Sequence, residues 1–215
     1  MNSNPSYLQR WKIAFNIQRF RLHFIATLLF LTGILFFIPY CFNYIQNRNG
    51  VVLNDYLLDS VGPMDVSWIT FTLIYACLLS ALVSLSFFPE RLLLMVQAYC
   101  VLTVLRVMSM LLIPLNEPAG IIILKDPVID MIGYDGKIIT KDLFFSGHVS
   151  TVFLLYLSVI NRRLKTVLLI AMVLIAGLIL VQHVHYTVDI LAAPLFSFIA
   201  FRTASWIQQK RPIER

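Results

Sequence analysis

Charged residues are scarce in this chain of 215 residues, making up 13% of it, while 59% of the residues are hydrophobic. One soluble core cannot hide that much apolar surface, so the composition excludes a soluble globular protein. Cysteine is scarce too, and Cys41, Cys77 and Cys100 lie singly, which is more typical of apolar packing than of disulfides or metal ligands. No basic stripe interleaved with aromatic residues indicates nucleic-acid binding.

What the chain has instead is a series of long apolar runs. A helix needs about 20 apolar residues to cross the hydrocarbon core of a bilayer. The predicted fold class is therefore all-α, a polytopic membrane protein with six transmembrane helices. They are expected over residues 22–45, 67–88, 91–114, 146–161, 165–183 and 185–207. Residues 1–21 then form a basic cytoplasmic segment, 22–208 the six-helix membrane domain, and 209–215 a cytoplasmic tail.

The distribution of Lys and Arg predicts how the chain lies in the membrane. Most of them flank the start of the first, third and fifth runs or the end of the last. Because positive residues favour the cytoplasmic side, we expect both termini there and the loops near 46–66 and 114–143 on the periplasmic or exoplasmic side. The cations left on that second side are Arg48, Lys125, Lys137 and Lys141. The net charge of +6 is then mostly a topology signal, with some attraction to anionic lipid.

A first polar cluster opens the fourth run. Ser146, or Asp142 before it, is a candidate N-cap, and Gly147 removes the side chain that would block a ligand from the helix end. Free backbone N–H groups and the positive end of the helix dipole suit a phosphate there, and His148 can donate a proton to it. The alternative is an ordinary capped helix start, with His148 bonded to a loop carbonyl.

A second polar cluster opens the last run. His185 and Asp189 are four residues apart, so on a helix the carboxylate can accept the ring N–H and fix the free nitrogen of the imidazole. A buried ion pair without catalytic function is the alternative. Both clusters begin helices on the same external face, and ionisable groups in membranes usually serve a function. We therefore predict a catalytic site that contains His148, His185 and Asp189.

Three further residues are candidates for this site. Arg106 lies in the outer half of the third run, where it can bind phosphate oxygens, snorkel to the interface, or pair with Asp189. His183 is assigned a supporting or substrate-binding role, and a zinc site built with it is only weakly indicated. Tyr186 fits an aromatic belt at the membrane interface, with contact to the substrate as the other possibility.

The two clusters resemble a known family. The segments 142–148, Asp-Leu-Phe-Phe-Ser-Gly-His, and 183–189, His-Val-His-Tyr-Thr-Val-Asp, resemble the third and fourth motifs of the sphingomyelin synthases. Those enzymes belong to the phosphatidic acid phosphatase type 2 superfamily. The resemblance implies six helices with the motifs on the exoplasmic side, His185 as a nucleophile that forms a phosphohistidine, Asp189 orienting it, and His148 protonating the leaving oxygen. It implies no metal and no cofactor.

Departures from the superfamily are as informative. Phosphatase members carry a Lys-x6-Arg-Pro motif on the active-site face, whereas here the spacing from Lys12 to Arg19 is followed by Phe20 at the cytoplasmic end. They also place Arg six residues before the nucleophile, where this chain has Ile179. Arg106 or Lys141 is therefore expected to bind the phosphate in place of these cations.

These observations predict an enzyme that acts on lipid substrates in the bilayer. The loop from Leu115 to Leu143, with its apolar stretch Ile121 to Leu124, is expected to cover the site and exclude water, which favours transfer of a phospho-head group between lipids. The first alternative is a phosphatase that hydrolyses lipid phosphomonoesters. A small transporter or proton relay is the second, although the unlike halves of the chain argue against it.

Overall fold

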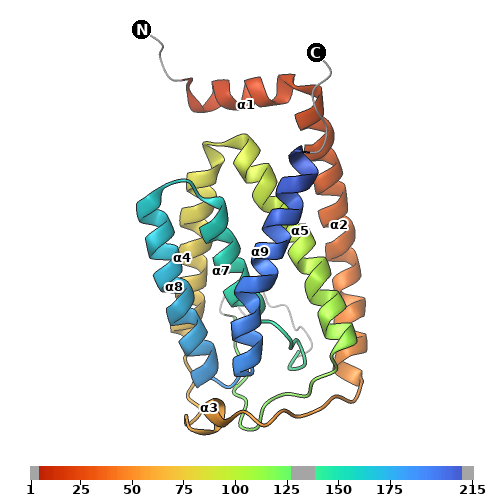
Figure 1. Cartoon of the computed structure of the whole chain (residues 1–215), viewed down its shortest axis with the longest axis vertical. Coiled ribbons are helices and arrows are strands. Elements are labelled where there is room, and N and C mark those ends of the chain that lie inside the picture. Colours follow the sequence, from red (N-terminus) through yellow and green to blue (C-terminus); the bar gives the residue numbers. More distant parts are fainter. Residues whose placement is uncertain (1–4, 127–138, 210–215) are drawn as a thin grey trace.

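The computed structural model describes residues 5–126 and 139–209, and each regular element in those residues is a helix (Figure 1). The all-α membrane fold expected from the apolar runs is confirmed. The helices are α1 (Tyr7–Asn16), α2 (Gln18–Asn47), α3 (Tyr56–Asp59), α4 (Ser67–Ser86), α5 (Pro89–Leu112), α7 (Gly147–Ser158), α8 (Arg162–Val181) and α9 (Thr187–Gln209).

The fourth predicted span is shorter than expected. In the part of the chain that the structure describes, 5 helices are long and apolar enough to cross a membrane, namely α2, α4, α5, α8 and α9. The run at 146–161 forms α7, a helix of 12 residues. At a rise of 1.5 Å per residue it is about 18 Å long, which is well short of a hydrocarbon core of about 30 Å. The six predicted helices are present, but this one does not span the membrane by itself.

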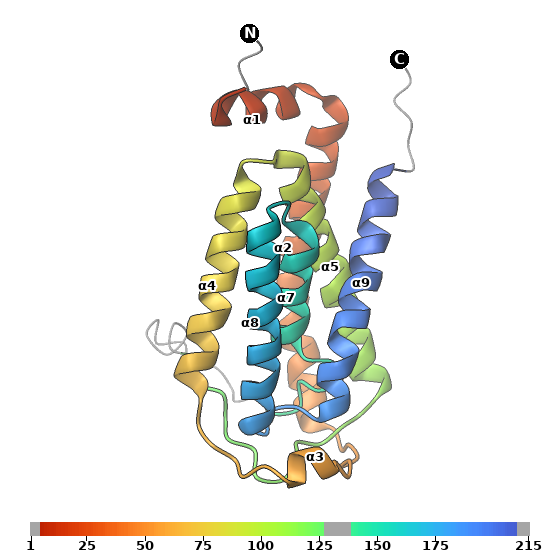
Figure 2. The same ribbon diagram turned by 60° about the vertical axis from the view of Figure 1, so that its left-hand side comes forward.

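Helix α7 is enclosed by the others. It packs against α4, α5, α8 and α9, and the small side chains of Ala98, Ala193 and Ala200, all fully buried, let the helices approach closely. The hydroxyl of Ser197 on α9 donates to the Ser150 carbonyl at 2.8 Å. Because α7 is short, its N-terminus lies inside the bundle, set back from the ends of α8 and α9 (Figures 1 and 2).

One end of the bundle carries both ends of the described chain. Helix α1 lies across this end (Figure 1), where the Trp11 indole donates to the Ser86 carbonyl at 2.9 Å. The start of α1 is a capping box formed by Ser6 and Gln9. Residues 1–21 were expected to form a basic cytoplasmic segment and no helix was assigned to them, although the Ser-x-x-Gln spacing is a recognisable signal for a helix start.

Loops pack together at the opposite end. Val51 donates its N–H to the Pro114 carbonyl at 2.9 Å, which joins the segment after α2 to the segment after α5. Gln182 comes directly after α8 and is fully buried. Its side-chain amide donates to the Ser67 hydroxyl at 2.7 Å, and its backbone carbonyl accepts from the N–H of Ile122 at 3.1 Å. These bonds fix the turn between α8 and α9.

Asp55 connects this loop layer to the start of α9. Its side chain caps α3 by accepting from Leu58 N–H, and it accepts from both the N–H and the hydroxyl of Thr187, at 2.6 and 2.9 Å. Partial burial raises the pKa of Asp55, but the hydrogen bonds from Thr187, Leu58 and Leu57 outweigh this and hold the pKa below its ordinary value of 3.8. The ionised form is therefore the one that stabilises the fold.

We predict that Asp55→Ala destabilises the protein at neutral pH by about 2 kcal/mol, because it removes two caps at once. A folded-state pKa below the unfolded value gives stability that is present above the unfolded pKa and lost as pH falls. The difference in stability between the variant and the wild type should therefore shrink as the pH falls from about 3.8 through the lower folded-state pKa of Asp55. Thermal unfolding in detergent across pH measures this. Asp59→Ala, at an exposed residue of the same helix, should unfold like the wild type at each pH.

Candidate active site

A strained turn precedes α7. Phe144 and Phe145 both have positive φ, at 57° and 51°, a conformation that costs a residue with a side chain on the order of 1 to 2 kcal/mol. Phe145 is fully buried and stacks on Phe196 of α9 with ring centroids 4.4 Å apart. Packing against α9 therefore holds the turn in place, and strain of this kind clusters at functional sites.

Ser146 joins the starts of two helices. Its hydroxyl accepts from Val149 N–H at 3.5 Å and caps α7, while its own N–H donates to the Asp189 carbonyl at 3.1 Å. Of the two predicted caps, Ser146 is the one found. The N–H groups of Gly147 and His148 lie in the first turn and have no acceptor within the helix, so they are suited to an anion.

His185 and Asp189 form the predicted buried pair, although His185 lies just before α9 and not on the helix as expected. The Nδ1 of His185 lies 3.2 Å from Oδ2 of Asp189, and the two side chains are 2% and 0% exposed. The same Oδ2 accepts from Tyr186 N–H at 3.2 Å. Asp189 is the third residue of α9, and its side chain here caps the residue just before the helix, as in a capping box. With the proton on Nδ1, the carboxylate leaves Nε2 as the nitrogen that carries a free lone pair.

Arg106 lies directly against the start of α7. Its guanidinium forms an ion pair with Asp142, whereas pairing with Asp189 had been considered from the sequence. A Cβ added at Gly147 would collide with this guanidinium. Gly147 is thus required for the close approach of a cation to the helix end, a combination that suits phosphate oxygens.

His148 completes the group. Its ring meets Phe71 of α4 edge to face, with centroids 5.8 Å apart. His148 directly follows Gly147, the residue that lies against the Arg106 guanidinium, so it belongs to the same helix start as that cation. The alternative in which His148 bonds a loop carbonyl through Nδ1 is not found among the described residues, where this buried atom has no partner.

Unpaired polar atoms gather at this site. Among the described residues, five buried side-chain nitrogen or oxygen atoms lack a hydrogen-bond partner, and four of these belong to the residues above. They are Nε of Arg106, Oδ1 of Asp142, Nδ1 of His148 and Oδ1 of Asp189. Buried polar atoms are rarely left unpaired, and such exceptions call for a functional explanation. Donors and acceptors for a polar ligand are therefore concentrated here.

Three predicted site residues are engaged elsewhere. The Lys141 ammonium donates to the Arg48 carbonyl at 2.7 Å. The two ring nitrogens of His183 face the carbonyls of Ala119 and Val61 at 3.0 and 2.8 Å. The Tyr186 hydroxyl donates to the Asn116 carbonyl at 2.9 Å.

Through these contacts the three side chains hold together the loops at this end of the bundle. Tyr186 is only 1% exposed, so its interpretation as part of an aromatic belt is wrong. A role for Lys141, His183 or Tyr186 in phosphate binding stays a prediction. In the described residues no group of three or more His, Cys, Asp or Glu side chains is arranged to hold a metal ion.

Two acidic residues that contact the site residues or the start of α9 were not predicted as partners from the sequence. Asp142 was considered only as a cap, yet it neutralises Arg106. Asp55 was not considered, yet it accepts from the first residue of α9. Both contacts link segments far apart in the chain, so local spacing gave no sign of them. The only available signal was that both external loops contain acidic residues, several in each.

Comparison with known families gives a match over the part of the chain that carries this site. The sequence model of a family described as PAP2 superfamily C-terminal matches residues 141–206. These residues run from the turn before α7 through most of α9. The match supports the phosphatidic acid phosphatase type 2 superfamily, whose members are phosphatases or phosphotransferases. It supports a lipid phosphatase or phosphotransferase kind of function. No curated protein matches the chain.

We predict that Gly147→Ala lowers turnover of the lipid substrate by about 100-fold or more, because the new methyl group displaces the guanidinium from the helix end. Helical content by circular dichroism should not change. Gly177→Ala is the matched control, since a Cβ there meets nothing within 4 Å and alanine favours a helix. Wild-type turnover in a folded Gly147→Ala protein would show that the contact between Gly147 and Arg106 has no part in the reaction.

Proposed function

We propose that this protein is a membrane phosphotransferase of sphingomyelin synthase type, which moves a phospho-head group from one lipid to another through a phosphohistidine on His185. The observation that carries the proposal is the gathering of unpaired polar atoms from Arg106, Asp142, His148 and Asp189 at two joined helix starts. A cation, an oriented imidazole and a second imidazole can together carry out displacement at phosphorus, as charge stabiliser, nucleophile and general acid.

The first step forms a covalent intermediate. The Nε2 lone pair of His185 attacks phosphorus while the bond from phosphorus to the lipid oxygen breaks. His148 donates a proton to that oxygen, so the donor lipid leaves as an alcohol. Asp189, at 3.2 Å from Nδ1, stabilises the positive charge that develops on His185. Arg106 and the first N–H groups of α7 offset the negative charge on the equatorial oxygens.

The second step reverses these roles. An acceptor hydroxyl attacks phosphorus, His148 takes the hydroxyl proton, and the phosphorus–nitrogen bond breaks with its electron pair returning to Nε2 of His185. The acceptor determines the reaction, because a lipid alcohol gives transfer and water gives hydrolysis. Burial of His185 and Asp189 and the recessed start of α7 support transfer, since they limit the access of water to the intermediate.

The external loop adds a more specific proposal. Its apolar stretch Ile121 to Leu124 is bonded through Ile122 to the Gln182 carbonyl, beside the turn that leads to His185. Residues 127–138 of the loop lie outside the described residues. We propose that the stretch helps to keep water from the site.

The roles of the two buried residues can be tested by substitution. His185→Ala should abolish turnover, and Asp189→Asn should lower it by about 10⁴-fold, because the histidine loses its orienting partner. An acid-labile adduct on His185, identified by mass spectrometry after rapid quenching, would support the covalent route. Exposed Asp59→Asn is the control for removal of a carboxylate. Normal activity in purified His185→Ala protein excludes it as nucleophile, and an adduct on His148 would reverse the two roles.

Product analysis distinguishes transfer from hydrolysis. The purified protein is incubated with labelled phospholipids, with and without ceramide or diacylglycerol, and each product is identified by mass spectrometry. We expect head-group transfer that depends on the added lipid alcohol, because the buried intermediate is shielded from water. Release of inorganic phosphate from lipid phosphomonoesters, unchanged by any acceptor, would instead identify a phosphatase.

We further propose that the site faces the periplasm or exoplasm, with both termini in the cytoplasm. The structure places Arg10, Arg91 and Arg162 at the same end of the bundle as α1, and positive residues favour the cytoplasmic side. Single cysteines at Val52 and Asn161, both exposed, test this in a background without Cys41, Cys77 and Cys100. An impermeant thiol reagent should label position 52 in sealed cells and not position 161. The opposite pattern would place the active site in the cytoplasm.

A further inference from the structure

A ladder of polar side chains runs along α2 at the end of the bundle that carries the termini. Arg19, His23 and Thr27 are four residues apart, so they lie on one face of the helix. Otherwise α2 is strongly apolar, and polar groups inside a membrane are costly unless they pair or serve a function. This face is turned towards α5 and α9, at the opposite end of α9 from Asp189.

The ladder is part of a network that joins three helices. The Gln97 amide on α5 donates to the Thr27 hydroxyl at 3.1 Å and lies 3.5 Å from Nδ1 of His23. The Gln208 amide on α9 donates to Oε1 of Gln97 at 3.0 Å. With Gln97 as the donor, Nδ1 of His23 accepts and the ring proton is on Nε2.

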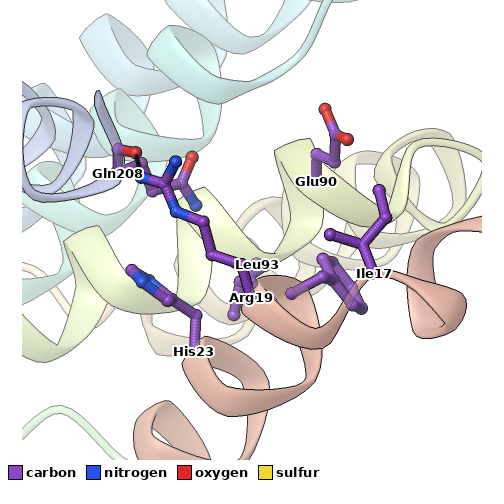
Figure 3. A pocket seen from close by; sticks show the side chains of 7 residues that line it. Ile17, Arg19, His23, Glu90, Leu93 and Gln208 are labelled. Carbon is purple, nitrogen blue, oxygen red and sulfur yellow. Dashed lines mark hydrogen bonds between the residues drawn. The ribbon is translucent and has the colours of Figure 1, made fainter. Parts of the chain in front are cut away.

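A pocket of about 230 Å³ opens beside this network (Figure 3). Arg19 extends from α2 towards α9, where its guanidinium donates to the Gln208 carbonyl, and Glu90 lies on the other side of the pocket on α5 (Figure 3). The pocket therefore presents a cation and a carboxylate on separate sides.

An apolar groove of about 500 Å³ adjoins the pocket and shares His23 with it. Its lining continues along α2 through Leu22, Ala26 and Phe30, and Cys100 and Ile207 line it from α5 and α9. Leu22 and Phe30 are 59% and 54% exposed on the lipid-facing surface, so the groove is open to acyl chains from the side. A polar pocket beside an apolar groove has the arrangement of a single membrane lipid, whose head group is polar and whose acyl chains are apolar.

We infer that this is a binding site for a phospholipid of the leaflet on the side of the termini, with a head group that carries both a phosphate and an ammonium, as in phosphatidylethanolamine. The phosphate binds Arg19 and His23, the ammonium binds Glu90, and an acyl chain lies along Ala26 in the groove. The opposite charges of Arg19 and Glu90 favour this zwitterionic head group over a purely anionic one. The inference does not depend on the proposed function, because none of its residues belongs to the candidate active site.

Native mass spectrometry of the full-length protein with defined lipids tests the head-group contacts. We expect one tightly held phosphatidylethanolamine and weaker retention of phosphatidylglycerol. Arg19→Ala should weaken retention by about tenfold, whereas Arg21→Ala, at an exposed residue of the same helix that does not line the pocket, should not. Glu90→Gln should remove the preference for phosphatidylethanolamine over phosphatidylglycerol. Wild-type retention by Arg19→Ala, equal loss in Arg21→Ala, or an unchanged preference in Glu90→Gln would overturn the inference.

The groove is tested separately, so that the inference does not rest on charge alone. Ala26→Trp fills the space between Leu22 and Phe30 and should displace the lipid. Ile25→Trp places the same side chain on an exposed position outside the groove and should leave the lipid bound. Retention of phosphatidylethanolamine by a folded Ala26→Trp protein at the wild-type level would exclude the groove as the acyl-chain site. Release by both variants would show that bulk on α2, and not the groove, controls retention.

Discussion

The hydrogen bond from the Ser146 N–H to the Asp189 carbonyl is the contact on which the candidate site depends. Its two ends belong to the first turns of α7 and α9, so it sets the distance between the helix that carries His148 and the helix that begins just after His185. Asp189 also positions His185 through its side chain. One residue therefore fixes both the neighbouring helix and the imidazole, which explains how a site made from two separate segments keeps a defined geometry.

This arrangement requires polar groups to lie well inside a membrane bundle, where they are costly when unpaired. The surrounding structure supplies the compensation. Phe145 stacks on Phe196 behind the turn, Asp55 holds the start of α9, and Gln182 fixes the preceding turn. None of these contacts touches the reacting atoms in the mechanism proposed here. They hold the groups that do, and this is typical of sites that depend on positioned charge.

Much of this could be predicted from local patterns. Apolar runs identified the helices, because the requirement to satisfy backbone hydrogen bonds in lipid leaves few alternatives. The spacing of His185 and Asp189 predicted that they meet, but the expected reason, a shared helix face, does not apply because α9 begins after His185. The contact forms because Asp189, in the first turn of α9, reaches back past the N-cap. The length of α7 could not be predicted, because Ala193, Ala200 and the other small residues that enclose it come from distant helices. For the same reason, the choice of Asp142 over Asp189 as the partner of Arg106 depends on how α5 and the turn before α7 meet in space.

The ion pair between Arg106 and Asp142 has a consequence for how anions exchange at the site. Asp142 is a carboxylate attached to the protein next to the cation, so its effective concentration there is high whatever the concentration of lipid. A phosphate that approaches Arg106 competes with this built-in anion, and a product that leaves is replaced by it. The pair thus lowers the affinity for donor and product alike. In the proposed reaction the substrate is as abundant as a membrane phospholipid, so weak binding is tolerated and the product lipid is released faster.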